Sequence, residues 1–590
     1  MTFAELASYF EKLEKTPSRI EMTKILAELF RQAGKEEIGE ICYLIQGRVA
    51  PLYAAIEFGI ADKLLIRAIA LASGHTEKEV VTEFKREGDL GVTAQNFKLR
   101  NQNLKFKKAS VVTVFKELEK IARSEGEGSQ EKKIQILADL ISTLEPLSVR
   151  YVVRIPLDKL RLGFSDMTIL DAFSWMLSGD KSLHGKLEEA YNVRPDMAYI
   201  ARHIKEHGIK GIGHVSAVVG APILASLCAR LPNAVEMIKK MGEVDVEPKY
   251  DGVRTAIHFK RDHKGIPDSP SGFRDDTHKG WVQAFSRKLE NTTAMYPELT
   301  RIGKQIRGKE VILDSEAIGY DVKTDRLIPF QETMTRKRKH DVAHVSNAIP
   351  LRFFVFDILY KDGKELLSMP LSERRKVLEA TMKHSHHLML SPQIVTRSAG
   401  GIRTYHDEQI KKGLEGAVVK KWNSVYEPGR KGFHWVKFKE EEGKIGKLTD
   451  TIDGVVMGYY RGEGKRTGFG IGAFLVGIAR GDAFVSVTKI GTGVSDELWK
   501  EIRTRLNDIK VSEQPKQYKD VAKMLIPDVW VAPKIVVELA GDDLTRSPNH
   551  GAGYAVRFPR LVRIRDDKSP REATTVAELT RMYNNQGSRV

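Results

Sequence analysis

The spacing of apolar residues predicts helices across roughly the first 235 residues. The first stripe with helical spacing consists of Phe3, Leu6, Tyr9, Phe10 and Leu13. Ser18 and Glu21 then fit a capping box, which marks the start of a second helix. Further helical stretches lie at 61–72, 111–122 and 132–144, with glycine-bearing loops between them and no repeat of fixed period. The N-terminal region is therefore predicted to be all-helical.

The pattern changes near Val244, where short apolar runs begin to alternate with polar turns. Such runs are typical of strands, and they start at residues 253, 310, 351, 416 and 434. The stretch 371–383 interrupts them with helical spacing. This part of the chain is therefore predicted to be a mixed sheet with a few helices.

A charged stretch at 439–447 has no apolar face to bury and is predicted to be a linker. Beyond it, strand signals start at residues 453, 473, 483 and 534, separated by glycine turns, and favour a small barrel of the OB type. A short helix is expected after Thr575, followed by a polar end. The fold class is thus multi-domain α+β: an all-helical domain over 1–235, a mixed α/β domain over 236–443 and an OB-fold β-barrel over 444–590.

Composition agrees with several domains and adds a prediction about the partner. The chain has 590 residues, too many for one core, and a formal net charge of +17. That surplus favours a polyanion, nucleic acid before membrane, although a generic basic surface would look the same. The two cysteines, Cys42 and Cys228, are too few for a disulfide framework or a four-cysteine zinc site. No signal peptide or membrane span is recognisable, so we expect a cytoplasmic, nucleoid-associated protein.

The strongest chemical signal is the segment EPKYDGVR, residues 247–254, around Lys249. A lone K-x-D-G pattern is weak, because it arises by chance about one time in ten in a chain of this length, and Lys249 could be a solvated lysine beside a turn. Further motifs follow it in order: FSRKLENTT at 285, ILDSEAIGYD at 312, FFVFDILY at 353, GLEGAVVKK at 413, HWVKFK at 434 and RFPRLVRIRDDKSP at 557. Together they resemble the nucleotidyltransferase motifs of ATP-dependent DNA ligases. The resemblance covers nearly the whole chain, and its layout is most similar to archaeal and eukaryotic replicative ligases.

The resemblance implies that Lys249 is the nucleophile, which forms a phosphoramidate with AMP. A lysine amine attacks phosphorus only when deprotonated, and the ordinary lysine pKa of about 10.4 must be lowered by neighbouring cations or a metal. The Asp251-Gly252 turn would let the backbone approach the nucleotide, because glycine has no side chain in the way.

The resemblance also assigns the remaining nucleotide contacts. It implies that Glu247 reads the adenine amino group, that Arg254 and Glu316 contact the ribose, that Arg287 grips phosphate, and that Phe356 stacks on adenine. Two alternatives stay open from the residues themselves. Glu316 could be one half of a structural ion pair, and Phe353, Phe354 and Phe356 could all belong to the core.

Glu415 matches the glutamate that places the catalytic metal, and Glu316 is a second candidate ligand. Both would suit Mg²⁺, with Mn²⁺ as an alternative. Lys437 and Lys439 alternate with Trp435, so a strand would put all three on one face, where the two lysines match contacts to the α-phosphate. A plain exposed strand face is the alternative. Arg430 and Lys431 compete for one further phosphate contact.

Two more motifs lie outside the central region. Arg565 and Lys568 match an R-x-D-K motif that orients the leaving pyrophosphate, although by composition alone this is a solvated charge run. Arg161 and Gly163, in LDKLRLGF, resemble the glycine motif of the DNA-binding domain. A helix-ending glycine is the simpler interpretation there.

The implied function is sealing of nicks in duplex DNA with ATP, in replication, repair and recombination. The rivals are an RNA ligase or capping enzyme, which usually lacks such a helical domain, an NAD-dependent ligase, which normally carries a zinc site, and a non-catalytic end-binding protein. We expect a monomer; the use of ADP or NAD and binding to a sliding clamp stay open. Three segments depart from the family pattern: 221–231 lacks its usual wording, the spacing after Arg430 is one residue longer, and 273–286 is extended.

Overall fold

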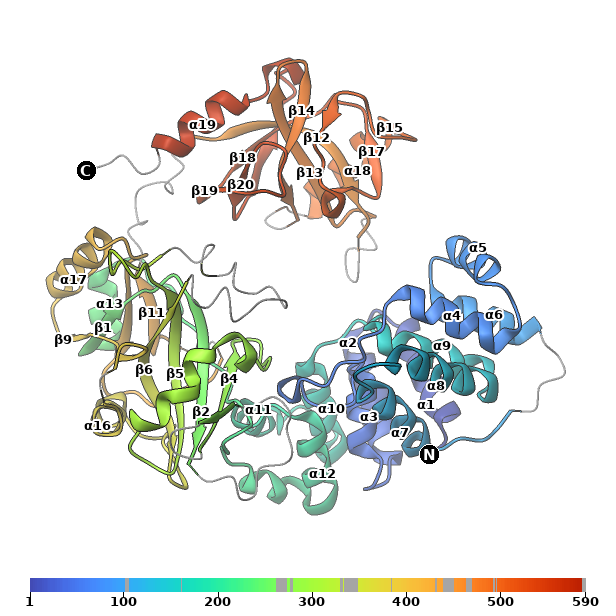
Figure 1. The fold of residues 1–590 in the computed structure, drawn as a ribbon, viewed down its shortest axis with the longest axis horizontal. Coiled ribbons are helices and arrows are strands. Elements are labelled where there is room, and N and C mark those ends of the chain that lie inside the picture. The colour runs from blue at the N-terminus through green and yellow to red at the C-terminus, as the bar shows by residue number, and fades with distance from the viewer. Residues whose placement is uncertain are drawn as a thin grey trace. The chain divides into compact units, whose positions relative to one another are not determined.

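The chain forms two compact units, Met1–Lys439 and Glu440–Val590 (Figure 1). The computed structural model describes residues 1–100, 106–160, 162–261, 273–275, 280–328, 333, 349–383, 385–429, 432–438, 450–462, 470–491, 494 and 496–585. The boundary between the units falls in the stretch 439–447 that the sequence predicts to be a linker, and this stretch lies outside the described residues. The predicted division at residue 235 stays a prediction.

The described residues up to His207 form a helical region, as the apolar spacing predicts. The helices are α1 (Phe3–Lys15), α2 (Arg19–Gln32), α3 (Ile38–Ile45), α4 (Asp62–Ser73), α5 (Glu77–Glu87), α6 (Leu90–Arg100), α7 (Val111–Ala122), α8 (Ser129–Thr143), α9 (Pro146–Arg154), α10 (Asp166–Ser178), α11 (His184–Val193) and α12 (Met197–His207). Their apolar stripes meet in one core that runs from Phe3 to Ile204. The predicted N-cap is correct, since Ser18 accepts from the Glu21 amide (3.3 Å), but both bonds of a capping box are present at Thr2 and Glu5 instead.

The second half of this unit consists of two mainly antiparallel sheets with flanking helices. Its elements are α13 (Ala234–Met241), β1 (Val244–Pro248), β2 (Val253–Lys260), β3 (Phe273–Asp275), β4 (Gly280–Ser286), β5 (Glu310–Gly319), β6 (Leu351–Lys361), β7 (Lys364–Glu365), α16 (Leu371–Thr381), β8 (Leu388–Leu390), β9 (Ile394–Thr396), α17 (Ala399–Lys411), β10 (Ala417–Lys421) and β11 (Trp435–Phe438). One sheet has the order β11-β10-β1-β9. The other has the order β3-β4-β2-β5-β6-β7, with β8 parallel to β6.

The segment before β1, whose sequence departs from the family pattern, is linked to these sheets by hydrogen bonds. The Gly220 amide donates to Nδ1 of His258 on β2 (3.0 Å), and the Ala229 amide donates to the carbonyl of Trp435 on β11 (2.8 Å). The Leu227 amide donates to the Gly429 carbonyl (2.7 Å). Two of these three bonds are between backbone groups and tolerate many side chains, whereas the Gly220 bond depends on His258.

The second unit is strand-rich and curves into half a barrel (Figure 1). Its elements are β12 (Ile452–Tyr460), β13 (Ala473–Arg480), β14 (Ala483–Ile490), α18 (Asp496–Asn507), β15 (Lys510–Val511), β16 (Tyr518–Lys519), β17 (Val529–Val531), β18 (Val536–Ala540), β19 (Asp543–Arg546), β20 (Tyr554–Arg557), β21 (Arg560–Ile564) and α19 (Val576–Asn585). Strand β12 pairs β13 on one side and both β17 and β18 on the other. A bulge at Val456/Gly458 bends it, and Gly458 is required there, because a Cβ would lie 2.6 Å from the Val529 carbonyl oxygen.

The predicted fold class is confirmed: a helical N-terminal region, a nucleotidyltransferase-type middle region and a strand-rich C-terminal region. Among the described residues, no helix combines the length and apolarity needed to cross a bilayer.

Candidate active site

Lys249 directly follows β1, on a loop that is fastened to the start of β10. The Lys249 amide donates to the Gly416 carbonyl (2.9 Å), and the Glu415 amide donates to the Lys249 carbonyl (3.2 Å). The Lys249 Nζ atom lies 2.5 Å from Oε2 of Glu415, and the lysine side chain is 21% exposed. The turn at Gly252 requires glycine, because a Cβ would lie 2.5 Å from the Ala317 carbonyl oxygen. The structure therefore brings the predicted nucleophile and the predicted metal ligand together at an accessible point.

Glu247 is buried two residues before Lys249, in a cluster of charged side chains. Its Oε1 atom lies 2.8 Å from Nζ of Lys420 and 3.9 Å from Nη1 of Arg375, although neither contact has the alignment of a hydrogen bond. Asp245, on the same face of β1, is fully buried, and burial together with the Glu247 charge raises its pKa well above the ordinary value. The Lys420 and Arg375 cations thus hold the Glu247 carboxylate in place.

Arg254 is fixed by protein partners. Its Nε and Nη2 atoms donate to the two carboxylate oxygens of Asp314 on β5 (3.0 and 2.5 Å). Its Nη1 atom donates to the Ser226 carbonyl, and Nη2 also reaches the Tyr426 hydroxyl (3.3 Å). These bonds fix the position of the Arg254 guanidinium. Its predicted contact with ribose stays a prediction.

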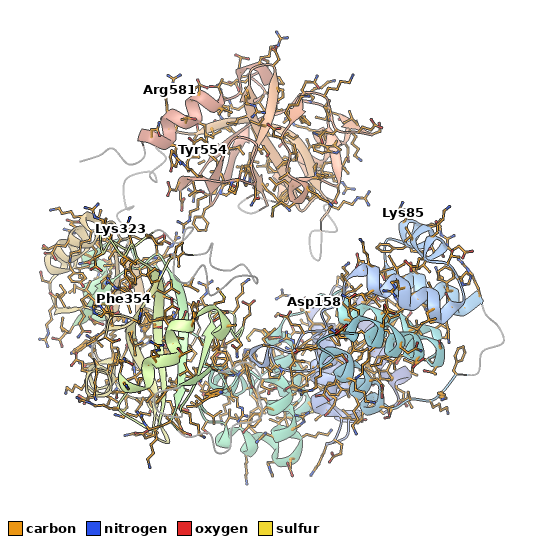
Figure 2. All side chains as sticks on the ribbon, in the orientation of Figure 1. Lys85, Asp158, Lys323, Phe354, Tyr554 and Arg581 are labelled. Carbon is orange, nitrogen blue, oxygen red and sulfur yellow. The ribbon has the colours of Figure 1, made fainter. Side chains whose placement is uncertain are left out.

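All three phenylalanines of FFVFD are buried, which fits the alternative that each contributes to the core. Phe353 has no exposed surface, and Phe354 and Phe356 are each 8% exposed. Phe354 stacks on Tyr250 with ring centroids 4.5 Å apart, and Figure 2 shows it among the side chains of the sheets. Phe356 packs edge-on against Trp435 (5.9 Å), with the Lys420 ammonium 4.7 Å from its ring centre.

Glu316 lies on β5 opposite Arg254 on β2. Burial raises the pKa of its carboxyl to about 7, against the lowering effect of the Arg254 and Lys249 charges. The Arg254 guanidinium forms its ion pair on this strand with Asp314. The described residues contain no cluster of three or more metal-ligating side chains.

The other predicted contacts are placed as follows. Trp435 and Lys437 lie on one face of β11, as the period of two predicts; Trp435 is buried and Lys437 half-buried. Arg287 is exposed in the turn after β4, and Gly163 is exposed with a left-handed φ of +76°. Arg161, Arg430, Lys431 and Lys439 lie outside the described residues.

In the second unit, Arg565 and Lys568 meet at one carboxylate. Nη1 of Arg565 donates to Oδ1 of Asp453 (3.1 Å), and Nζ of Lys568 donates to its Oδ2 atom (2.6 Å). Arg565 also makes a two-bond contact with Asp567 (2.8 and 2.7 Å). Charge-run composition alone does not predict this arrangement, because it depends on β12 lying beside the motif.

Several contributing residues were absent from the sequence prediction, among them Lys420, Asp314, Tyr426 and Asp453. Lys420 and Asp314 lie within motifs given above. The sequence alone does not show whether a lysine such as Lys420 is buried or exposed. Asp314 carried a usable signal, since it precedes Glu316 by two positions and so shares its strand face. Tyr426 and Asp453 are remote in sequence from the groups that they contact.

Comparison with known proteins agrees with this architecture. Residues 2–174 match the family model for the DNA ligase N terminus, 271–439 that for the ATP-dependent DNA ligase domain, and 467–568 that for the ATP-dependent DNA ligase C-terminal region. A probable DNA ligase of Dictyoglomus thermophilum is 41% identical, over 99% of this chain and 98% of that protein. A DNA ligase of Saccharolobus solfataricus is 36% identical with the same coverage. A solved structure, Pmar-Lig_PreS3, has a TM-score of 0.55 over 95% of this chain and 99% of its own, and its 16% identity supports the fold alone.

The fold and the family match over 271–439 define the middle of the chain as a nucleotidyltransferase domain. Since full-length relatives exceed one third identity, the chain belongs to the ATP-dependent DNA ligase family, whose general activity is the sealing of nicks in DNA.

Proposed function

We propose that this ligase seals nicks through a covalent AMP adduct on Lys249. The observation that carries the proposal is the position of Lys249, directly after β1 and with Nζ 2.5 Å from Glu415. In the first step Nζ attacks the α-phosphorus of ATP, a nitrogen–phosphorus bond forms, and the bond to the departing pyrophosphate breaks. The Glu415 carboxylate can hold the ammonium before ATP arrives and steady the amine once its proton has left.

The buried charges around the lysine suit a nucleotide. Glu247, held by Lys420 and Arg375, offers carboxylate oxygens to the adenine amino group, which only donates. Arg254 supplies fixed positive charge near the sugar, and Lys437 adds charge near the α-phosphate. Because Arg254 is already held by protein contacts, it needs little reorganisation as charge develops on the phosphate oxygens.

A divalent cation fits the carboxylates of this site. Glu415 and Glu316 would hold it, since hard cations prefer oxygen ligands, and a nearby positive charge would favour the ionised form of the Glu316 carboxyl. Bound Mg²⁺ would lower the negative charge of the phosphates during attack. Mn²⁺ has the same ligand preference and is the alternative.

In the later steps AMP passes to the 5′-phosphate at the nick, and the 3′-hydroxyl then displaces it and closes the backbone. We assign the grip on duplex DNA mainly to the helical region, where the exposed Gly163 amide can approach a phosphate, and Arg161 would add charge. A net charge of +17 supports binding through phosphates, and one chain carries every motif, so a monomer suffices.

The proposal is tested by sealing of a labelled nicked duplex with ATP, ADP or NAD and with Mg²⁺ or Mn²⁺ in turn. We expect sealing of DNA with ATP and a divalent cation, and no sealing after chelation. Joining of single-stranded RNA but not of nicked DNA would contradict the proposal and favour the RNA-ligase alternative.

A further inference from the structure

Asp453 contacts both Arg565 and Lys568, the two cations that the resemblance to the ligase motifs assigns to the leaving pyrophosphate. Its carboxylate lies 3.1 Å from Nη1 of Arg565 and 2.6 Å from Nζ of Lys568. It is 13% exposed, as is Arg565, while Lys568 is 29% exposed. Two cations so close together repel each other, and a shared carboxylate offsets that repulsion. Asp453 is therefore the group that keeps Arg565 and Lys568 together.

The backbone of Asp453 is itself fixed. Its amide donates to the Thr574 hydroxyl (3.0 Å), and its carbonyl accepts from the Thr574 amide (2.8 Å). Asp453 also pairs with Glu538 in the β12–β18 register, and Glu538 bonds Arg563 (2.7 Å) and lies 3.6 Å from Arg565. The carboxylate thus projects from a strand that has pairing partners on both sides.

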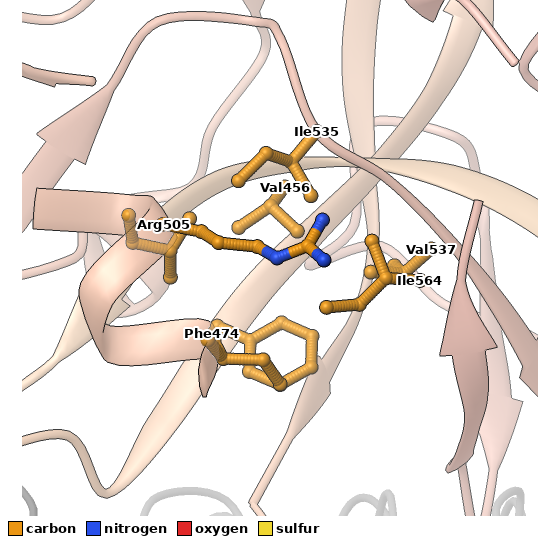
Figure 3. Close-up of a pocket in the computed structure, with 8 residues that line it drawn as sticks. Val456, Phe474, Arg505, Ile535, Val537 and Ile564 are labelled. Carbon is orange, nitrogen blue, oxygen red and sulfur yellow. The ribbon is translucent and has the colours of Figure 1, made fainter. Parts of the chain in front are cut away.

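The neighbouring acids of the motif are engaged elsewhere. Asp567 makes a two-bond contact with Arg565, and Asp566 is held by Nη1 of Arg505 on α18 (2.5 Å). Figure 3 shows the Arg505 side chain lying across an apolar pocket, between Val456 and Ile535 on one side and Phe474 on the other. Of these three acids, Asp453 is therefore the one that contacts both Arg565 and Lys568.

We propose that Asp453 is a positioning residue for the adenylylation step, holding Arg565 and Lys568 as one preformed cation pair that pyrophosphate engages. The inference rests on the proposed role of those two cations. A phosphate presents two oxygens much as the carboxylate does, so a pair spaced for Asp453 is also spaced for a phosphate group. Asp453 does not contact the reacting atoms; it acts through the two side chains.

The test uses the full chain with Asp453→Asn, which keeps the shape and removes the charge. We expect adenylylation at saturating ATP to slow about ten-fold, because misplaced cations stabilise the transition state less well. Sealing of a pre-adenylylated nick should change little. Discharge of the Lys249–AMP adduct by added inorganic pyrophosphate should slow in parallel. Asp453→Glu, which retains the charge, should recover part of the rate.

Asp520→Asn is the charge control, since Asp520 is an ion-paired aspartate of the same unit whose partner is Arg480. Equal loss of adenylylation and sealing in Asp453→Asn, or a loss no larger than in Asp520→Asn, would overturn the inference. In a Lys568→Ala background the cost of Asp453→Asn should shrink to about two-fold, because the two residues act as a unit; full additivity would also overturn it. If Lys568→Ala and Arg565→Ala alone slow adenylylation no more than sealing, the proposed role of the cations fails instead.

Discussion

Two lysines with proposed chemical roles are each held by a carboxylate, yet in different surroundings. Lys249 Nζ lies 2.5 Å from Glu415, and Lys568 Nζ lies 2.6 Å from Asp453. Around Lys249 the supporting charges are buried: Glu247 is 2% exposed and Lys420 1%. Around Lys568 the contacting carboxylate of Asp453 is 13% exposed, but the other acids of its motif are at the surface, where Asp567 is 60% and Asp566 71% exposed.

This difference in burial determines how substitutions at each site affect stability and activity. Buried charges interact strongly and cost much to leave unpaired, whereas exposed pairs are screened by water and contribute little to stability. Substitutions around Lys249 should therefore impair both chemistry and folding. Substitutions around Lys568 should change the rate of one step and leave the fold intact.

The largest expected effect is that of Lys249→Ala, which should abolish self-adenylylation because the attacking amine is gone. The assay is transfer of label from ATP to the protein. Lys260→Ala is a matched control, since Lys260 lies in the same unit, is also 21% exposed and pairs with Glu310 at 2.9 Å. A labelled Lys249→Ala protein would show that another group is the nucleophile.

Lys420→Met should be next in size, because it leaves the Glu247 carboxylate buried with less compensation. We expect a loss of about 3 kcal/mol in the free energy of unfolding and a raised KM for ATP. Lys421→Met, on the same strand but half-buried, should cost far less. Urea unfolding of both variants makes the comparison, and equal stability would mean that the Glu247 charge does not depend on Lys420.

Lys568→Ala should slow adenylylation about ten-fold or more, since a hydrogen bond to a charged group contributes about 2 kcal/mol. Sealing of a pre-adenylylated nick and the melting temperature should change little. The two reactions are measured separately on one preparation. Equal losses in both would assign Lys568 to structure or DNA binding, and the contrast with Lys249 would disappear.

The smallest expected effect concerns His258, a fully buried group of the first unit. Burial lowers its pKa to about 3, from an unfolded value of about 6.5. The unfolded chain thus gains a proton between these values while the folded chain does not, so stability falls as the pH drops below about 6.5. From pH 7 to 5.5 we expect a loss of about 1 kcal/mol, which His258→Gln should reduce. An unchanged pH slope in the variant would rule out His258 as its source.

Much of the fold was predictable, because apolar spacing reports directly on buried faces. The helix over 111–122 and the strand starts at 253, 310 and 351 were located from period alone, and α7, β2, β5 and β6 confirm them. The helix α17 was missed, since Gly400 and Gly401 in its first turn argue against a helix. The helix α18 was missed although Trp499, Ile502 and Leu506 stand at helical spacing and are buried.

Of the site, motif order led to the residues and could not give their partners. The amino-acid sequence alone does not show that Arg254 bonds Asp314, or that Lys568 lies beside Asp453, 115 positions earlier in the chain. Such pairs form because strand pairing brings distant segments together. Sequence spacing reports on contacts within an element and is silent on contacts between elements.

Whether Lys249 carries AMP can be determined by locating the adduct. The full chain is incubated with ATP and Mg²⁺, digested, and each peptide is sequenced by tandem mass spectrometry. The account predicts one adenylylated residue, Lys249, and loss of the adduct when nicked DNA is added. AMP on a different residue, or no covalent AMP in a preparation that seals nicks, would contradict it.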